Sequence, residues 1–231
     1  MSHSTSSAPP SRLRSLFQNV ELVTVILLGI VSVATAYTSF QSGLYGGASD
    51  DRISRSAAKG TEAESLYLEA NQQYVQDTQS ILRLSDFDVL KKSADPITAF
   101  DAAAQYDELY FIGVSEDLDA AITNAAALDV SEPDFWHDPQ ADEDYQAALF
   151  GGYADAADES ETLRAEGDRI GDQGDQLGFY TALMAITLFL LGVAAVVRRP
   201  LMQWILIAVG MSIFVVTAIG TAFIPFVWIG F

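Results

Sequence analysis

The sequence predicts an all-α membrane protein with three transmembrane helices and an extracytoplasmic helical bundle or stalk inserted between the first and second of them. Two observations favour this fold class: three long runs lack charged residues, and nearly all acidic residues lie between the first two runs. A hydrocarbon layer of about 30 Å is crossed by a helix of roughly 20 residues. Each run is long enough to make that crossing.

The charged residues are segregated along the chain. The region from Asp50 to Asp175 contains 30 of the 31 acidic residues but only 8 of the 12 basic ones, so its formal charge is −22. Such a surface repels phosphates and offers no basic stripe to hold them, and we therefore expect no binding to nucleic acid.

The type of acidic residue also carries information. Asp outnumbers Glu by 20 to 11, and the chain has only three lysines, a composition typical of proteins that work in near-saturated salt. We therefore expect a halophilic protein. The alternative is an acidic domain that binds cations or basic partners, but the acidic residues are spread over the whole region rather than gathered in one block.

The apolar runs and the basic residues together predict a topology. Positive charge marks the cytoplasmic side, and both the segment before the first run and the turn with Arg198 and Arg199 are basic. We expect a multi-pass protein of the cell membrane with a cytoplasmic N-terminus and an extracytoplasmic middle region and C-terminus. The alternative is a cleaved signal peptide over residues 1–36. The expected parts are a disordered cytoplasmic tail (1–19), a first span (20–42), an acidic extracytoplasmic helical domain (43–176), a second span (177–197), a cytoplasmic turn (198–200), a third span (201–224) and an outer interfacial C-terminus (225–231).

The end of the first span is marked by aromatic residues. Tyr37, Phe40 and Tyr45 are expected to anchor the helix in the outer headgroup layer, as aromatic belts do. Residues 41–43 are expected to mark the exit from the membrane, with a bend of the chain at Gly46 and Gly47. At the other end of the chain, Phe226, Trp228 and Phe231 are expected at the same interface.

The acidic region is expected to be helical. Composition and proline positions predict one long helix, a short helical segment, two further helices, a loop and a final helix that continues into the second span. These are residues 49–82, 88–94, 96–111, 116–128 with Ser115 as N-cap, 129–145, and a helix from about Glu143.

The final helix has an apolar repeat of seven residues. Its members are Leu149, Ala156, Leu163, Ile170 and Leu177.

Two glycines follow a neighbouring seam. Gly167 and Gly174 would let another backbone approach closely, with Gly43, Gly46 and Gly47 as possible neighbours. The alternative is that the glycines simply interrupt the helix.

The first span also has a face of small residues. Gly29, Ser32, Ala36 and Ser39 are spaced as in helix-packing interfaces. They are expected to pack either within the chain or between copies of it.

Two segments resemble a known family. The stretches "ATAYTSFQSGLYGG" and "GDQLGFYTALMAITLFLLGVAAVVRRP" resemble a family of uncharacterised prokaryotic three-span membrane proteins with an extracytoplasmic domain of unknown function, of which this chain would be a haloarchaeal-type member. Phe40 and Gln41 stand at the family's aromatic–Gln pair, and Tyr45 stands where the family tends to have tryptophan. The loop from Pro133 to Trp136 followed by Tyr145 is also similar. The resemblance implies an uncleaved first span and no known activity.

No catalytic or cofactor motif is present. The chain has no cysteine, and it lacks the nucleophile-elbow, phosphate-loop and dinucleotide patterns. His137 has acidic neighbours, but their spacing matches no familiar metal site. We expect neither an enzyme nor a bound cofactor or metal.

Two functions fit these observations. The first is an integral membrane interaction protein, a scaffold, sensor or accessory subunit, whose outer domain contacts another membrane or envelope protein, a ligand or itself. The alternative is a homo-oligomeric channel in which the Ser and Thr residues of the first span line a pore below an acidic, cation-attracting vestibule.

Overall fold

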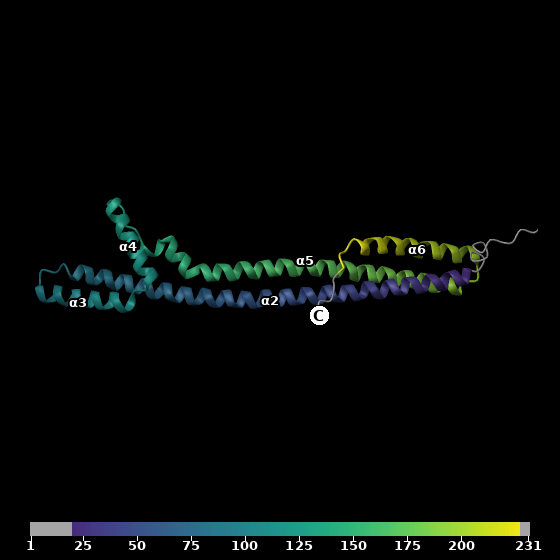
Figure 1. Cartoon of the computed structure of the whole chain (residues 1–231), viewed down its shortest axis with the longest axis horizontal. Coiled ribbons are helices and arrows are strands. Elements are labelled where there is room, and N and C mark those ends of the chain that lie inside the picture. The colour runs from purple at the N-terminus through teal and green to yellow at the C-terminus, as the bar shows by residue number, and fades with distance from the viewer. Residues whose placement is uncertain (1–19, 227–231) are drawn as a thin grey trace, which may run out of the picture. The chain divides into compact units, whose positions relative to one another are not determined.

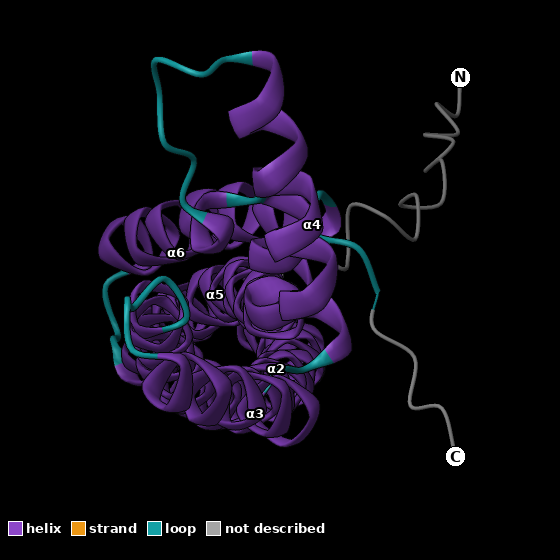
Figure 2. Ribbon diagram, turned by 90° about the vertical axis from the view of Figure 1, so that its left-hand side faces the viewer, coloured by secondary structure: helices purple, strands orange, loops and turns teal. Residues whose placement is uncertain are grey.

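The computed structural model describes residues 20–226. Of these described residues 89% are helical and none is in a strand (Figures 1 and 2). The predicted tail at residues 1–19 and the expected positions of Trp228 and Phe231 lie outside the described residues. In chain order the elements are α2 (Val20–Leu90), α3 (Pro96–Gly113), α4 (Glu116–Ser131), the 3₁₀ helix η1 (Pro139–Ala141), α5 (Glu143–Val196) and α6 (Pro200–Ala222).

The prolines delimit the helices. Pro96 and Pro200 stand in the first turns of α3 and α6, where the missing N–H would have no partner within the helix. Between Val20 and Leu90 there is no proline at all, and the same holds within α5. The absence of this helix breaker permits lengths of 71 and 54 residues.

The bend expected at Gly46 and Gly47 is wrong, whereas the exit from the membrane expected at residues 41–43 stays a prediction. Residues 41–47 continue α2 without a break or a bend, and no described glycine has a positive φ. Each glycine in a helix costs only about 1 kcal/mol relative to alanine. Packing of Tyr45 and Ser49, both buried, compensates for that cost. The separate helices predicted at 49–82 and 88–94 are likewise parts of α2 or of the turn after it.

The helices predicted at 96–111 and 116–128 are confirmed as α3 and α4, each slightly longer than expected. Asp95 caps α3 by accepting hydrogen bonds from the backbone N–H groups of Ile97 and Thr98. Ser115 caps α4 as predicted, because its hydroxyl accepts from the N–H of Leu118. The continuous helix from Glu143 into the second apolar run is confirmed as α5.

The chain forms two compact units, which are described separately. Unit 1 comprises Met1–Ile53 and Ala165–Phe231, and its apolar core joins Val31 of α2, Met184 and Leu191 of α5, and Ile207 of α6. Unit 2 is Ser54–Arg164. Its core is smaller and centres on buried residues of α4 and of the beginning of α5, with Leu118 and Tyr145 as the largest.

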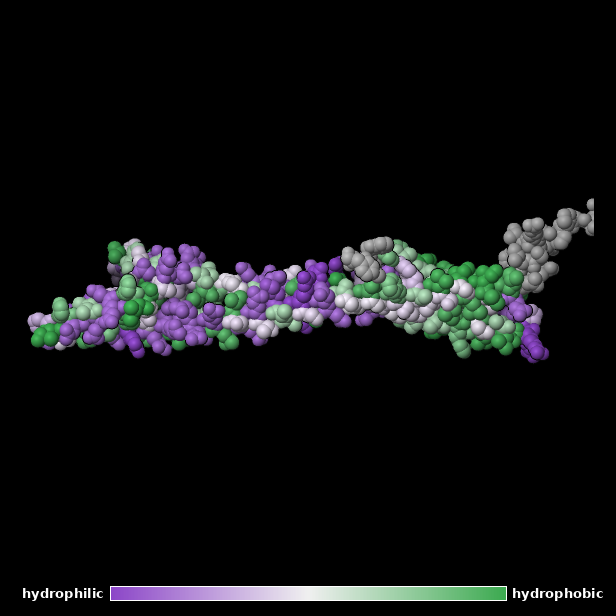
Figure 3. All heavy atoms as spheres, turned by 60° about the horizontal axis from the view of Figure 1, so that its bottom comes forward, coloured by the Kyte–Doolittle hydropathy of each residue, from purple (hydrophilic) through white to green (hydrophobic). Residues whose placement is uncertain are grey.

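Within residues 20–226, three helices are long and apolar enough to cross a membrane, namely α2, α5 and α6. Within their most apolar windows only 11%, 22% and 17% of the residues are buried inside the protein. The apolar side chains therefore lie mainly on the outside, where lipid rather than water is their favourable surrounding. Figure 3 shows the hydrophobic atoms of α6 and its neighbours as a nearly continuous green surface, whereas unit 2 is mainly purple with separate green patches. These features are compatible with a multi-pass membrane protein.

Candidate functional site

Serines of α2 donate hydrogen bonds to carbonyl groups at the glycines of α5. In unit 1 the Ser42 hydroxyl donates to the carbonyl oxygen of Gly174 at 2.9 Å, and that of Ser49 donates to Gly167 at 2.8 Å. Each step of seven residues along α2 is matched by a step of seven back along α5. We call these four residues the serine–glycine seam. Figure 1 shows α2 and α5 running side by side there.

The seam depends on the missing side chains of its glycines. A Cβ atom at Gly174 would lie 3.1 Å from the Cβ of Tyr45 and 3.5 Å from the backbone nitrogen of Gly46. A Cβ at Gly167 would meet Ile53 at 2.8 Å and Arg52 at 3.2 Å. The close approach predicted at both glycines is therefore present, and its partner is α2.

Of the three glycines expected opposite this seam, one contributes. Gly46 lies against Gly174, whereas Gly43 and Gly47 have nothing within 4 Å of the position a Cβ would take. The same kind of polar contact recurs in unit 2, where the hydroxyls of Ser56 and Ser160 each donate to the other residue's carbonyl oxygen, at 2.8 and 2.9 Å.

Sequence reasoning missed the serines of the seam. The signal in the sequence is the spacing of Ser42, Ser49 and Ser56 at intervals of seven residues, which matches the spacing of Gly167 and Gly174.

Ion pairs lie beside these contacts between α2 and α5. Arg52 pairs with Glu166 in unit 1, and Lys59 pairs with Glu159 in unit 2.

The small residues of the first span do not pack inside the chain. Gly29, Ser32, Ala36 and Ser39 are all exposed, and a Cβ at Gly29 would meet nothing within 4 Å. The expectation that these four residues pack within the chain is therefore wrong, and packing between copies stays a prediction. The face is free to meet lipid or another protein.

The aromatic residues near the end of the apolar segment of α2 differ in their surroundings. Tyr37 and Phe40 are exposed as expected for membrane anchors, and the Tyr37 ring stacks on that of Phe226 at 6.4 Å between centroids. Tyr45 is buried instead, because it lies on the side of α2 that packs inside unit 1, and its hydroxyl donates to the carbonyl oxygen of Pro225 at 2.7 Å. Its ring therefore does not face outward as that of an anchor would, and its expected depth at the headgroup layer stays a prediction.

The turn between α5 and α6 is short and basic. Arg198 and Arg199 are both exposed, and Arg199 stands at the N-cap of α6 without a capping bond from its side chain. Both guanidinium groups are thus available to solvent or to lipid headgroups.

Unit 2 contains a buried carboxylate. Asp77 of α2 accepts hydrogen bonds from the hydroxyl of Tyr145 at 2.7 Å and from the amide of Gln73 at 2.8 Å. Burial, followed by the hydrogen bond to Asp77, raises the pKa of Tyr145 above its usual range. Both side chains of this pair are almost fully buried, and the pair fastens the start of α5 to α2.

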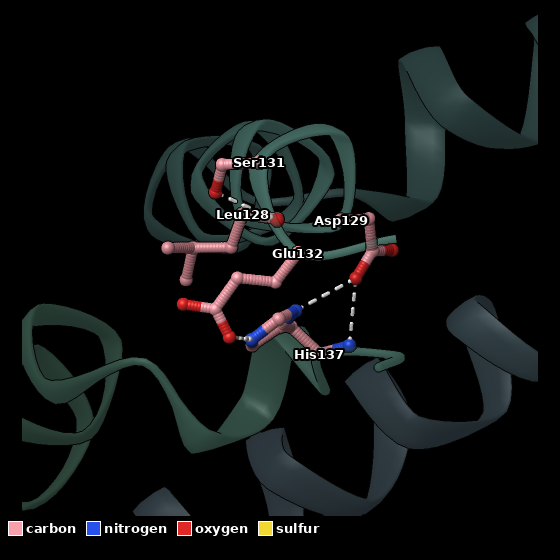
Figure 4. A network of polar contacts seen from close by, with 5 residues as sticks. All are labelled: Leu128, Asp129, Ser131, Glu132 and His137. Carbon is pink, nitrogen blue, oxygen red and sulfur yellow. Dashed lines mark hydrogen bonds and ion pairs between the residues drawn. The ribbon is translucent and has the colours of Figure 1, made fainter. Parts of the chain in front are cut away.

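His137 lies in a second polar network, drawn in Figure 4. Its ring Nδ1 and its backbone N–H both lie 2.8 Å from Oδ1 of Asp129, and its Nε2 lies 3.7 Å from Glu132. The hydrogen bonds from the ring and then from the backbone of His137 lower the pKa of Asp129.

This network lies beside a cleft of about 230 Å³ that Tyr106 and Trp136 help to line. Among the described residues no group of three or more His, Asp or Glu side chains is placed to hold a metal ion. Within the same part of the chain, every buried side-chain nitrogen or oxygen has a hydrogen-bond partner. The polar groups of unit 2 therefore satisfy one another.

One helix of unit 2 presents apolar side chains outward. Ile97, Phe100 and Phe111 are 72–88% exposed, and their spacing of three and eleven residues places them on one side of α3. We call these three residues the α3 face. On α3 only Ala102 is buried, and the helix carries three acidic residues and no basic one.

The comparisons with known proteins returned no match: no family model fits the chain, and no curated protein or solved structure is similar to it. The resemblance to the three-span family stays a prediction.

Proposed function

We infer that the protein is a membrane-anchored interaction protein, a scaffold or accessory subunit, that binds a second envelope protein through the α3 face. The observation that carries this proposal is the exposure of Phe100 and Phe111 in a strongly acidic unit. Large aromatic side chains that are left in water cost free energy, and burial of each contributes about 1.5–3 kcal/mol to an association. Aromatic residues are also the anchors that most often dominate protein interfaces.

The proposal places unit 2 outside the cell and the N-terminus in the cytoplasm. Exposed Arg198 and Arg199 in the α5–α6 turn support this orientation, because basic turns are retained on the cytoplasmic side. A surface rich in Asp supports work in concentrated salt. At 1 M salt the interaction between surface charges is screened beyond a distance of about 3 Å. Apolar contacts then contribute most of the free energy of association.

The charge around the α3 face indicates the chemistry of the partner. Three acidic side chains, Asp101, Asp107 and Glu108, lie on the same helix without a basic residue among them. A partner with an apolar surface and a rim of Arg or Lys would complement it. Two acidic copies of α3 would repel each other, so a second copy of the chain is not the expected occupant of this face.

Photo-crosslinking in native membranes tests the proposal. A photoreactive phenylalanine analogue replaces Phe100, and the matched control carries it in place of Gln105, which is exposed on another side of α3. We expect one crosslinked protein from position 100, with a basic apolar surface, and at least tenfold less of it from position 105. Phe111→Asp should abolish this product. Equal products from both positions, a product that contains only this chain, or no product would contradict the proposal.

A homo-oligomeric channel is the second candidate. The observation that favours it is the exposure of Ser32 and Ser39 on the first span, where a ring of copies would place hydroxyl groups along a pore. Single-channel recordings of the purified protein test it directly. Block of a measured current by a water-borne thiol reagent in Ser32→Cys would support the channel, whereas an unaffected current or the absence of any current would exclude it.

A further inference from the structure

The outer side of α2 in unit 2 carries a second apolar repeat. Leu68, Val75, Leu82 and Val89 follow one another at intervals of seven residues, and their side chains are 47–67% exposed. Ala70, Asp77 and Leu84, which point into unit 2, are buried on the opposite side of the same helix. At 100° per residue the two rows are about 160–200° apart. We call the exposed row the outer stripe.

The surface beside the middle of the outer stripe is almost free of charge, whereas its ends are charged: Glu64 and Glu69 lie beside Leu68, and Arg83, Asp86 and Asp88 lie beside Leu82 and Val89. Unit 2 contains 24 acidic and 6 basic residues, yet from Ala70 to Leu82 the only charged residue is Asp77, which is buried. The exposed polar side chains of that stretch are amides, namely Asn71, Gln72, Gln76 and Gln79. From Val75 to Leu82 the outer stripe is thus bordered mainly by neutral groups, in a unit that is otherwise strongly acidic.

We propose that the outer stripe is the contact between two copies of this chain, with the two α2 helices parallel and in register. Helices that pair along their length have two rows of facing residues per seven-residue repeat. The outer stripe supplies one apolar row, and in its middle part the second row consists of the neutral amides Gln72 and Gln79. From Leu68 to Val89 the stripe covers three heptads, about 32 Å at 1.5 Å per residue. Two copies inserted in one membrane with the same orientation have α2 helices that run in the same direction.

The neutral stretch from Ala70 to Leu82 favours a second copy. Salt screens charges that are more than about 3 Å apart at 1 M, but elsewhere on two acidic units a contact would press carboxylates directly against one another, whereas this stretch brings together only amide and apolar groups. A partner with a basic rim, as suggested for the α3 face, would find no carboxylates beside Val75. Confinement in a membrane raises the local concentration of the two copies, so a modest apolar contact suffices.

A two-fold axis along the paired helices gives the proposal a precise geometry. Each residue of the outer stripe meets its own counterpart, as isologous contacts require. Residues one position away, such as Gln76, are turned by 100° and point away from the axis. Neighbouring positions on α2 therefore differ sharply in their distance from the same position of the other copy.

Disulfide crosslinking uses this difference, because the natural chain contains no cysteine. Val75→Cys and Leu82→Cys are compared with the matched control Gln76→Cys, in native membranes with an added oxidant. We expect the two stripe variants to form covalent dimers at least fivefold faster than the control. Equal rates, no dimer from either stripe position, or crosslinking only to a different protein would overturn the proposal.

The molar mass of the detergent-solubilised protein in multimolar salt provides the second test. We expect a dimer for the natural chain and a monomer for Val75→Glu combined with Leu82→Glu, with unchanged helix content because both positions are exposed. A natural chain that is monomeric, or a double variant that stays dimeric, would overturn it. Crosslinking from position 100 of the α3 face is measured on the same double variant, so that failure of one contact is distinguished from failure of the other.

Discussion

Replacement of Gly174 by alanine tests the close approach of α5 and α2. The new Cβ would lie 3.1 Å from the Cβ of Tyr45 and 3.5 Å from the carbonyl oxygen of Ser42. A contact of about 3.1 Å between two carbon atoms is shorter than their optimal separation of about 3.5–4.0 Å. Because the Cβ of Tyr45 is fixed to its backbone, a rotamer change cannot relieve the contact, and the helices have to move apart.

The expected cost follows from three contributions. Alanine in place of a helical glycine stabilises by about 0.5–1 kcal/mol. Overpacking at a tight contact costs about 1–3 kcal/mol. Separation of the helices also weakens the 2.9 Å hydrogen bond from Ser42 to the carbonyl of Gly174, whose net value is about 0.5–1.5 kcal/mol. We expect a net loss of roughly 1–3 kcal/mol in the free energy of unfolding.

Gly43→Ala is the matched control. Gly43 lies in α2 with nothing within 4 Å of its missing Cβ, so only the gain in helix propensity remains. For a chain of this size 1 kcal/mol shifts the melting temperature by about 2–4 °C.

Thermal unfolding of both variants, followed by circular dichroism in the same detergent and salt, should show opposite shifts. Gly174→Ala should melt roughly 2–12 °C lower and Gly43→Ala about 1–4 °C higher than the natural chain. If Gly174→Ala were stabilised as much as the control, the close packing at this glycine would be refuted.

Three further predictions concern unit 2 and the topology. Tyr145→Phe removes a donor from the buried carboxylate of Asp77 and should lower the stability by about 1–3 kcal/mol in a denaturant titration; an unchanged midpoint would contradict it. The pKa of Asp142 is lowered in the folded protein, first by the hydrogen bond from the backbone N–H of Tyr145. The stabilisation of the folded state by this carboxylate is therefore complete above the usual pKa of 3.8 and is lost as the pH falls through the lower pKa of the folded protein. Asp142→Asn should flatten this part of the acid unfolding curve, and an identical curve would argue against it. Thiol labelling of intact cells should modify Thr61→Cys but not Arg199→Cys, and the reverse pattern would reject the proposed orientation.

The helices could largely be predicted from the sequence because their signals are local. Proline at positions 96 and 200 marks a helix start, and Ser115 caps α4 wherever the rest of the chain goes. The lengths of the three uncharged runs can likewise be read directly from the sequence. Each of these features depends on the chemistry of a few neighbouring residues, which a single sequence displays in full.

The continuity of α2 could not be predicted in this way. Gly43, Gly46 and Gly47 have the composition of a loop, and only the packing of α5 against Tyr45 and Ser49 explains why the helix continues. Aromatic residues near the end of a span indicate a membrane interface but not the direction in which each ring points. Tyr45 therefore turned inward although Tyr37 and Phe40 did not.

The serine–glycine seam required knowledge of the partner helix. A serine is an ordinary polar residue until the carbonyl that accepts its hydrogen bond is known, and that carbonyl lies 118–132 residues further along the chain. The exposure of the α3 face was equally hidden, because Ile97 and Phe100 look like core residues in the sequence.

The regular spacing of the serine–glycine seam also makes its pairing degenerate. If α2 slid along α5 by seven residues, about 10 Å, Ser42 would face Gly167 and would find another glycine carbonyl in the same geometry. The repeat holds the helices together without determining which heptad faces which. Contacts that occur once have to select the alignment, such as the hydrogen bond from Tyr45 to Pro225 in unit 1 and that from Tyr145 to Asp77 in unit 2. A buried polar pair thus determines the register of the two helices, as single polar residues do in coiled coils.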